Sequence, residues 1–136
     1  MKTTLFILGL VCVVFLLAAL LFPSVSDGPD YRSRTKNDVT QISFAISAYK
    51  SEYGNYPTGN QAEILNILKG SNSKNIVFIE LPEKQFDKSG YFIDQWGTPY
   101  QIDISNQSDK PRVWSFGKNR KDDKGAEHTD DVASWN

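Results

Sequence analysis

The sequence of 136 residues has few of the residues on which most catalytic and redox centres depend. It contains one cysteine, Cys12, so an intramolecular disulfide is excluded. Its one histidine, His128, lies in a charged segment without apolar neighbours, where a surface position is expected rather than a role in Ser-His-Asp catalysis. No glycine-rich phosphate-binding motif is present. These features predict that the protein is not an enzyme.

The sequence also lacks an excess of positive charge. Its formal net charge is -1, which excludes the broad basic field that nucleic-acid binding requires. No repeat of architectural length is visible. The length suits one domain with an appendage, and we assign residues 1–26 to a membrane anchor or signal segment and residues 27–136 to the domain.

Residues 5–22 form one uncharged and almost wholly apolar run. As a helix this run would rise roughly 27 Å, close to the thickness of a bilayer core. Lys2 precedes it, which favours a cytoplasmic N-terminus with the domain on the other side. The alternative is a signal peptide cleaved after Ser26, because Ser24 and Ser26 supply the small residues that signal peptidase requires. The length of the run favours the anchor.

An amphipathic helix is predicted over residues 31–53, and the rest of the domain must fold against it. Its apolar residues recur at steps of three and four and share one stripe: Val39, Ile42, Ala45, Ile46, Tyr49 and Tyr53. Lys50 and Glu52 are expected to point away from that stripe. Gly54 favours the end of the helix, and Pro57 prevents it from resuming.

The remaining pattern predicts a small antiparallel sheet, which makes the fold class α+β. The expected elements are a short helix at 61–69, an extended segment at 76–81, a tight turn at 94–100, and strands at 100–104 and 112–116. Gly97 permits the turn, and Pro99 fixes the backbone where the first strand begins. Val132 and Trp135 are expected to bring the C-terminus back onto the sheet.

Several short motifs in one order resemble the major (G-type) pseudopilins of the type II secretion system. The residues that carry the resemblance are Asp38-Val39, Ile42, Ala45-Ile46, Tyr49, Gly54, Tyr56-Pro57-Thr58, Gln61, Ile64-Leu65, Asp94, Trp96-Gly97, Pro99-Tyr100, Trp114-Ser115-Phe116-Gly117, Asp130-Asp131-Val132 and Trp135. The resemblance covers about residues 38–136, with a longer insert across 71–90. It implies a pilin-like fold, with a long helix packed on the sheet.

The resemblance further implies a calcium-binding loop near the C-terminus. By analogy, the ligands would be the backbone carbonyl near Phe116 and the side chains of Asn119 and Asp131, with Asp130 as a neighbour that could substitute. Further candidates in this longer loop are Asp122, Asp123 and Glu127. The sequence departs from the family in having Asn119 where an aspartate is usual. Four cations in the loop, Lys118, Arg120, Lys121 and Lys124, are expected to weaken binding.

The N-terminus departs from the family more strongly. Prepilins carry a glycine cleavage point, a following aromatic residue and a glutamate within the apolar run. Here Leu10 follows Gly9, and residues 5–22 contain no acid. A carboxylate in hydrocarbon is energetically costly and is kept only for function. Its absence therefore indicates that residues 5–22 do not resemble a prepilin signal.

Two functions therefore stay open. One is a structural pseudopilin-like subunit in the inner membrane, with its domain in the periplasm and other secretion-system subunits, or further copies of itself, as partners. The other is an exported or membrane-anchored binding module that does not assemble. The tryptophans Trp96, Trp114 and Trp135 fit either the core and hairpin packing of a small domain or, less commonly, a ligand site.

Overall fold

The computed structural model describes residues 30–105 and 110–136. The proposed anchor or signal segment, residues 1–26, lies outside these ranges. Within the two described ranges, no helix is both long enough and apolar enough to cross a membrane. Residues Tyr31 to Asn136 form one compact unit.

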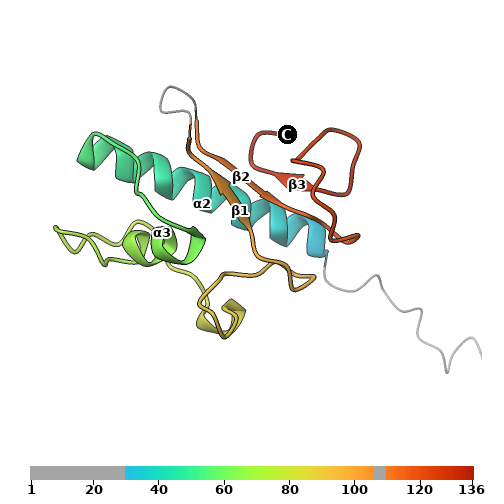
Figure 1. The fold of residues 1–136 in the computed structure, drawn as a ribbon, viewed down its shortest axis with the longest axis horizontal. Coiled ribbons are helices and arrows are strands. Elements are labelled where there is room, and N and C mark those ends of the chain that lie inside the picture. Colours follow the sequence, from blue (N-terminus) through green and yellow to red (C-terminus); the bar gives the residue numbers. More distant parts are fainter. Residues whose placement is uncertain (1–29, 106–109) are drawn as a thin grey trace, which may run out of the picture. The chain divides into compact units, whose positions relative to one another are not determined.

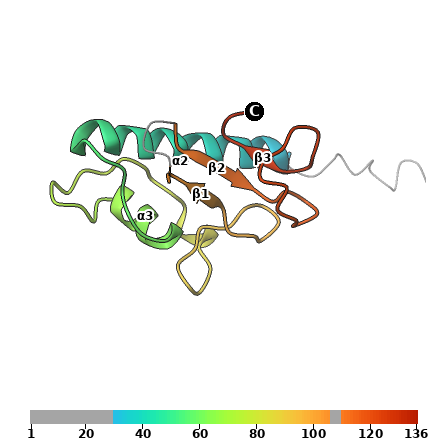
Figure 2. The ribbon, with the colours of Figure 1, turned by 45° about the horizontal axis from the view of Figure 1, so that its top comes forward.

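Helix α2 (Tyr31–Tyr53) runs along one side of the domain, with the strands beside it (Figures 1 and 2). Its predicted bounds are confirmed, and Gly54 ends it with a φ of 82°. Val39, Ile42 and Ile46 are fully buried, so the predicted stripe is the core-facing side of the helix. The stripe continues as aromatic packing, because the rings of Tyr49 and Tyr53 stack with centroids 4.4 Å apart.

The sheet has three antiparallel strands in the order β1 (Gln101–Asp103), β2 (Arg112–Ser115) and β3 (Val132–Ala133). The predicted hairpin is confirmed by the β1–β2 pairing, in which Ile102 lies opposite Val113. The C-terminal tail forms a strand of its own, β3, which the sequence pattern did not identify. Strands β2 and β3 pack against α2, and Val113 and Val132 bury their side chains there.

The short helix α3 (Gln61–Leu68) is confirmed to within one residue of its predicted end. It begins with a capping box, in which Asn60 and Glu63 each accept a hydrogen bond from the other's backbone amide. Its buried residues Ile64, Leu65 and Leu68 complete the core. Residues 76–81 form neither a helix nor a strand, and a single-turn 3₁₀ helix, η1 (Glu83–Gln85), follows them.

Buried polar side chains hold the irregular segments onto the sheet. Asp94 accepts hydrogen bonds from the amides of Trp96 and Thr98, each at 2.9 Å, and from the Ser115 hydroxyl at 2.6 Å. Gln61 bonds both the amide and the carbonyl of Phe92, at 3.1 and 2.8 Å. The Gln61 bonds add to the backbone hydrogen bond that the Tyr100 amide donates to the Phe92 carbonyl at 3.2 Å, so this irregular segment is held by both backbone and side-chain bonds.

One predicted orientation was wrong. Lys50 does not point away from the domain: it is half-buried, with its ammonium 4.1 Å from the ring centre of Tyr56. The tryptophans divide between the two kinds of packing: Trp96 packs partly against the hydrophobic core, whereas Trp114 of the hairpin packs against Trp135 outside it. Trp135 keeps 39% of its surface exposed. A cation–π contact stabilises this orientation of Lys50, and the strand alternation of β2 keeps Trp114 out of the core.

Candidate metal centre in the β2–β3 loop

The loop that joins β2 to β3 begins at a position that only glycine fits. Gly117 has a φ of 66°, and a Cβ atom there would lie 2.5 Å from the carbonyl carbon of Asp130. The start and the end of the loop therefore meet at this point. Ser115 fixes the approach, since its hydroxyl accepts a hydrogen bond from the Gly117 amide at 2.9 Å. Because the two ends of the loop meet, acidic residues that are far apart in the sequence can lie close together within it.

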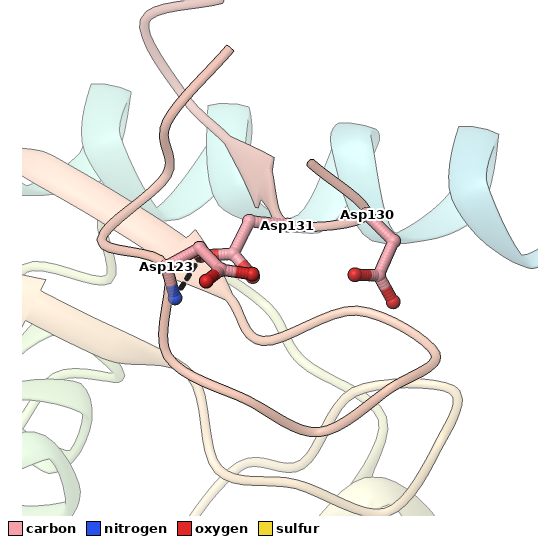
Figure 3. A group of neighbouring side chains, drawn as sticks. All are labelled: Asp123, Asp130 and Asp131. Carbon is pink, nitrogen blue, oxygen red and sulfur yellow. Dashed lines mark hydrogen bonds between the residues drawn. The ribbon is translucent and has the colours of Figure 1, made fainter. Parts of the chain in front are cut away.

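Three carboxylates come together within this loop. Oxygens of Asp123, Asp130 and Asp131 all lie within 4.8 Å of one another. Figure 3 shows the carboxylates of Asp123 and Asp131 next to each other, with that of Asp130, the residue before Asp131, to their right. Like charges this close repel each other unless a cation or protons neutralise them.

Asp131 is the buried member of the cluster, with 2% of its surface exposed. Its Oδ2 accepts hydrogen bonds from the amides of Asp123 at 3.1 Å and Gly125 at 2.9 Å. Among the described residues, no donor reaches its Oδ1, although that atom is buried. Burial raises the pKa of Asp131, and the nearby charges of Asp123 and Asp122 raise it further against the two amide hydrogen bonds. A buried carboxylate oxygen without a partner is the position that a cation would satisfy.

Asp130 is held by Asn119 on the opposite side of the loop. The Asn119 amide donates to Oδ2 of Asp130 at 2.6 Å, and the Asn119 side-chain nitrogen donates to Oδ1. The Asn119 side-chain oxygen accepts from the Lys121 amide at 2.6 Å. Arg32 of α2 donates to the carbonyls of Asp130 and Asp131, at 3.3 and 3.4 Å, which ties this segment to the helix.

Comparison with known proteins gives the family. The family model described as "Type II secretion system (T2SS), protein G" matches residues 27–135. The chain belongs to this family. It is 27% identical to the type II secretion system core protein G of Pseudomonas aeruginosa over 95% of this chain and 89% of that protein. The core protein G of Aeromonas hydrophila is 26% identical, over 98% of this chain and 90% of that protein.

The protein of the same name from Pectobacterium carotovorum is 28% identical, over 98% of this chain and 83% of that protein. No solved structure matches the chain significantly. The predicted membership of the major pseudopilin family is therefore confirmed by sequence relatives. The geometry of the loop comes from this chain alone.

In this protein G family member, the structure brings together part of the predicted ligand set. Asp130 and Asp131 join the cluster, and Asn119 is bonded to Asp130 rather than being one of the clustered acids. Phe116 directly follows β2 and is half-buried. Asp123, which the sequence ranked only as a further candidate, is the third member.

The other candidates lie outside the cluster. Asp122 points toward the sheet, where it accepts a hydrogen bond from the Trp114 indole at 2.9 Å. Glu127 and His128 are exposed. The signal that distinguishes Asp123 from Asp122 is the turn at Gly125, whose φ of 66° brings its amide to Asp131. The positions of the acidic residues in the sequence do not predict that turn.

The donor set determines which metals suit the site. The three clustered groups are carboxylates, and the clustered set contains neither an imidazole nor a thiolate. Hard oxygen donors favour calcium or magnesium over zinc or copper. The loop cations Lys118, Arg120, Lys121 and Lys124 are all exposed, so solvent weakens their opposition to a bound ion.

Proposed function

We propose that this chain serves as a structural pseudopilin subunit of a type II secretion machine. The observation that carries the proposal is the family match over residues 27–135. The described fold is consistent with that role, because a long helix presents its buried stripe to a small antiparallel sheet. Such a subunit acts by assembly, so its partners would be other secretion-system subunits or further copies of itself.

The finer assignment concerns location. Residues 5–22 are long and apolar enough to anchor the chain in the inner membrane, and Lys2 favours a cytoplasmic N-terminus. The domain would then lie in the periplasm. Signal cleavage after Ser26, followed by export of the domain, is the alternative outcome.

We also propose that the β2–β3 loop holds a calcium ion. The carboxylates of Asp123, Asp130 and Asp131 would supply the charge, and Oδ1 of Asp131 is the buried acceptor that lacks a donor in the described part of the chain. Calcium takes six to eight oxygens at flexible angles, so backbone carbonyls and water would complete its coordination. The ion would relieve the repulsion among the three acids and hold β3 in place.

The function is tested by secretion in the bacterium that encodes the chain. Deleting its gene should stop the release of type II substrates into the medium and leave them in the periplasm. The intact gene should restore release, as should a Gln41→Ala variant, whose side chain is exposed on α2. Unchanged secretion after the deletion, in a strain without a second gene of this family, would favour the binding module that does not assemble.

The N-terminus of the mature chain provides a second way to distinguish the two proposed functions. Because residues 5–22 contain no acid and Leu10 follows Gly9, we expect no prepilin-type cleavage. Intact mass and N-terminal sequencing of the chain from membranes should give either the uncut chain or one that starts after Ser26. A mature chain that begins at Leu10 with a methylated amine would contradict this expectation.

A further inference from the structure

The outer face of the sheet carries a cavity that the secretion role does not explain. Its volume is about 240 Å³. Strands β1 and β2, the β2–β3 loop and the C-terminal tail each contribute to its walls. The lining residues are Asp103, Arg112, Trp114, Asp122, Lys124 and Trp135.

Strand alternation places the cavity on the side of the sheet away from α2. In β2 the side chains of Val113 and Ser115 are buried against the helix, so Arg112 and Trp114 point to the other face. Asp103 lies directly opposite Arg112 in the β1–β2 register. Trp114 and Trp135 thus lie outside the hydrophobic core of the domain.

The walls of the cavity are held in place before any ligand arrives. The Arg112 guanidinium lies 4.2 Å from the ring centre of Trp135, and the rings of Trp114 and Trp135 meet edge to face at 6.0 Å. Asp122 fixes the Trp114 indole through the 2.9 Å hydrogen bond. Gly125 leaves room for Trp135, because a Cβ atom there would overlap its ring, with Cη2 only 2.7 Å away. Pre-organisation of this kind lowers the entropic cost of binding.

The charges lining the cavity balance. Two carboxylates, Asp103 and Asp122, face two cations, Arg112 and Lys124. The hydrogen bonds from Ser105, and after them the Arg112 charge, lower the pKa of Asp103. A balanced set of strong donors and acceptors disfavours an ion as ligand. It suits a neutral molecule with several hydroxyl groups.

We propose that this cavity binds one ring of a neutral sugar. The C–H faces of a pyranose pack against indole rings, while its hydroxyl groups bond carboxylates and guanidinium groups at the edge. A volume of about 240 Å³ lies below the roughly 300–1,000 Å³ of pockets for drug-sized ligands, which limits the site to about one ring. The proposal is independent of the secretion role, since it depends only on the outer face of the sheet.

The test uses the full chain in a detergent without a sugar headgroup. Saturation-transfer NMR is recorded with methyl glucoside, methyl galactoside and methyl N-acetylglucosaminide, and with a blocked glycine–tyrosine–glycine peptide. We expect saturable transfer to at least one glycoside with millimolar affinity. Trp135→Ala should weaken that affinity by about tenfold or more, the size expected for one lost aromatic contact.

Two further variants control for folding. Asp103→Asn keeps the shape of a side chain at the cavity edge and should weaken binding several-fold without changing the circular dichroism. Trp96→Phe alters a tryptophan that does not line the cavity and should leave the affinity unchanged. Absence of transfer to all three glycosides, or affinity unaffected by both Trp135→Ala and Asp103→Asn, would overturn the proposal. Transfer to the peptide alone would overturn it in favour of a protein-docking site.

Discussion

Replacing Gly117 by alanine is expected to destabilise the domain by about 2–4 kcal/mol, the sum of backbone strain and overpacking. The φ of Gly117 is 66°, which is unfavourable for alanine. The new Cβ atom would also lie 2.5 Å from the carbonyl carbon of Asp130, a backbone atom that cannot rotate away. Because Asp130 leads into β3, relief of this clash must move the strand or the carboxylate cluster. Urea unfolding of residues 30–136, followed by tryptophan fluorescence, measures the loss.

Gly97 supplies the matched control. Its φ of 85° is also positive, but no atom lies within 4 Å of a Cβ atom built there. Gly97→Ala should therefore cost only the strain, about 1 kcal/mol. Equal losses at the two positions would show that the close approach of Gly117 to Asp130 is absent in solution.

Ile46→Ala in α2 is expected to cost about 2–5 kcal/mol, because it removes a large buried side chain and leaves a cavity. Ile46 is fully buried against the core, with Val39 and Ile42 on the same stripe. The same urea unfolding measures the loss, and the slope against denaturant should stay unchanged if only packing is lost.

The control for Ile46 is Gln41→Ala, on the exposed side of the same helix, which should cost under about 0.5 kcal/mol. Lys50 is unsuitable as a control, since its ammonium lies over the ring of Tyr56. Similar losses from Ile46→Ala and Gln41→Ala would mean that the helix buries a different face.

The regular elements of this fold were predictable because their signals are local. The steps of three and four in α2 and the alternation in the hairpin depend only on nearby residues. Strand β3 has only two residues, too few for an alternating pattern to be recognised in the sequence. It forms by pairing with Trp114 and Ser115 of β2. The hydrogen bonds of Asp94 and Gln61 join segments far apart in sequence, so no local pattern reveals them.

The candidate site was predictable only in part for the same reason. Family order pointed to Asn119, Asp130 and Asp131, but the choice of Asp123 over Asp122 depends on the turn at Gly125. The positions of the tryptophans were also not predictable from the sequence. Their number suggested packing, whereas the alternation of β2 places Trp114 on the outer face of the sheet, where it meets Trp135.

We propose that calcium bound in the β2–β3 loop stabilises this domain, and Asp131→Asn tests this proposal with little change in the shape of the side chain. An asparagine oxygen can still accept from the amides of Asp123 and Gly125, while its NH₂ group replaces the buried Oδ1 that lacks a donor among the described residues. The buried charge is lost, so the metal-free variant should be as stable as the unchanged domain within about 1 kcal/mol. Its ability to hold calcium should be lost.

The deciding measurement is the thermal unfolding midpoint of residues 30–136, in millimolar calcium and in chelator. A dissociation constant of about 10⁻⁴–10⁻³ M predicts about 1–2 kcal/mol of stabilisation at about 5 mM calcium, or a rise of about 5–10 °C. The account predicts this rise for the unchanged domain and none for Asp131→Asn. Equal midpoints in calcium and chelator for the unchanged domain, or an undiminished rise in Asp131→Asn, would contradict it.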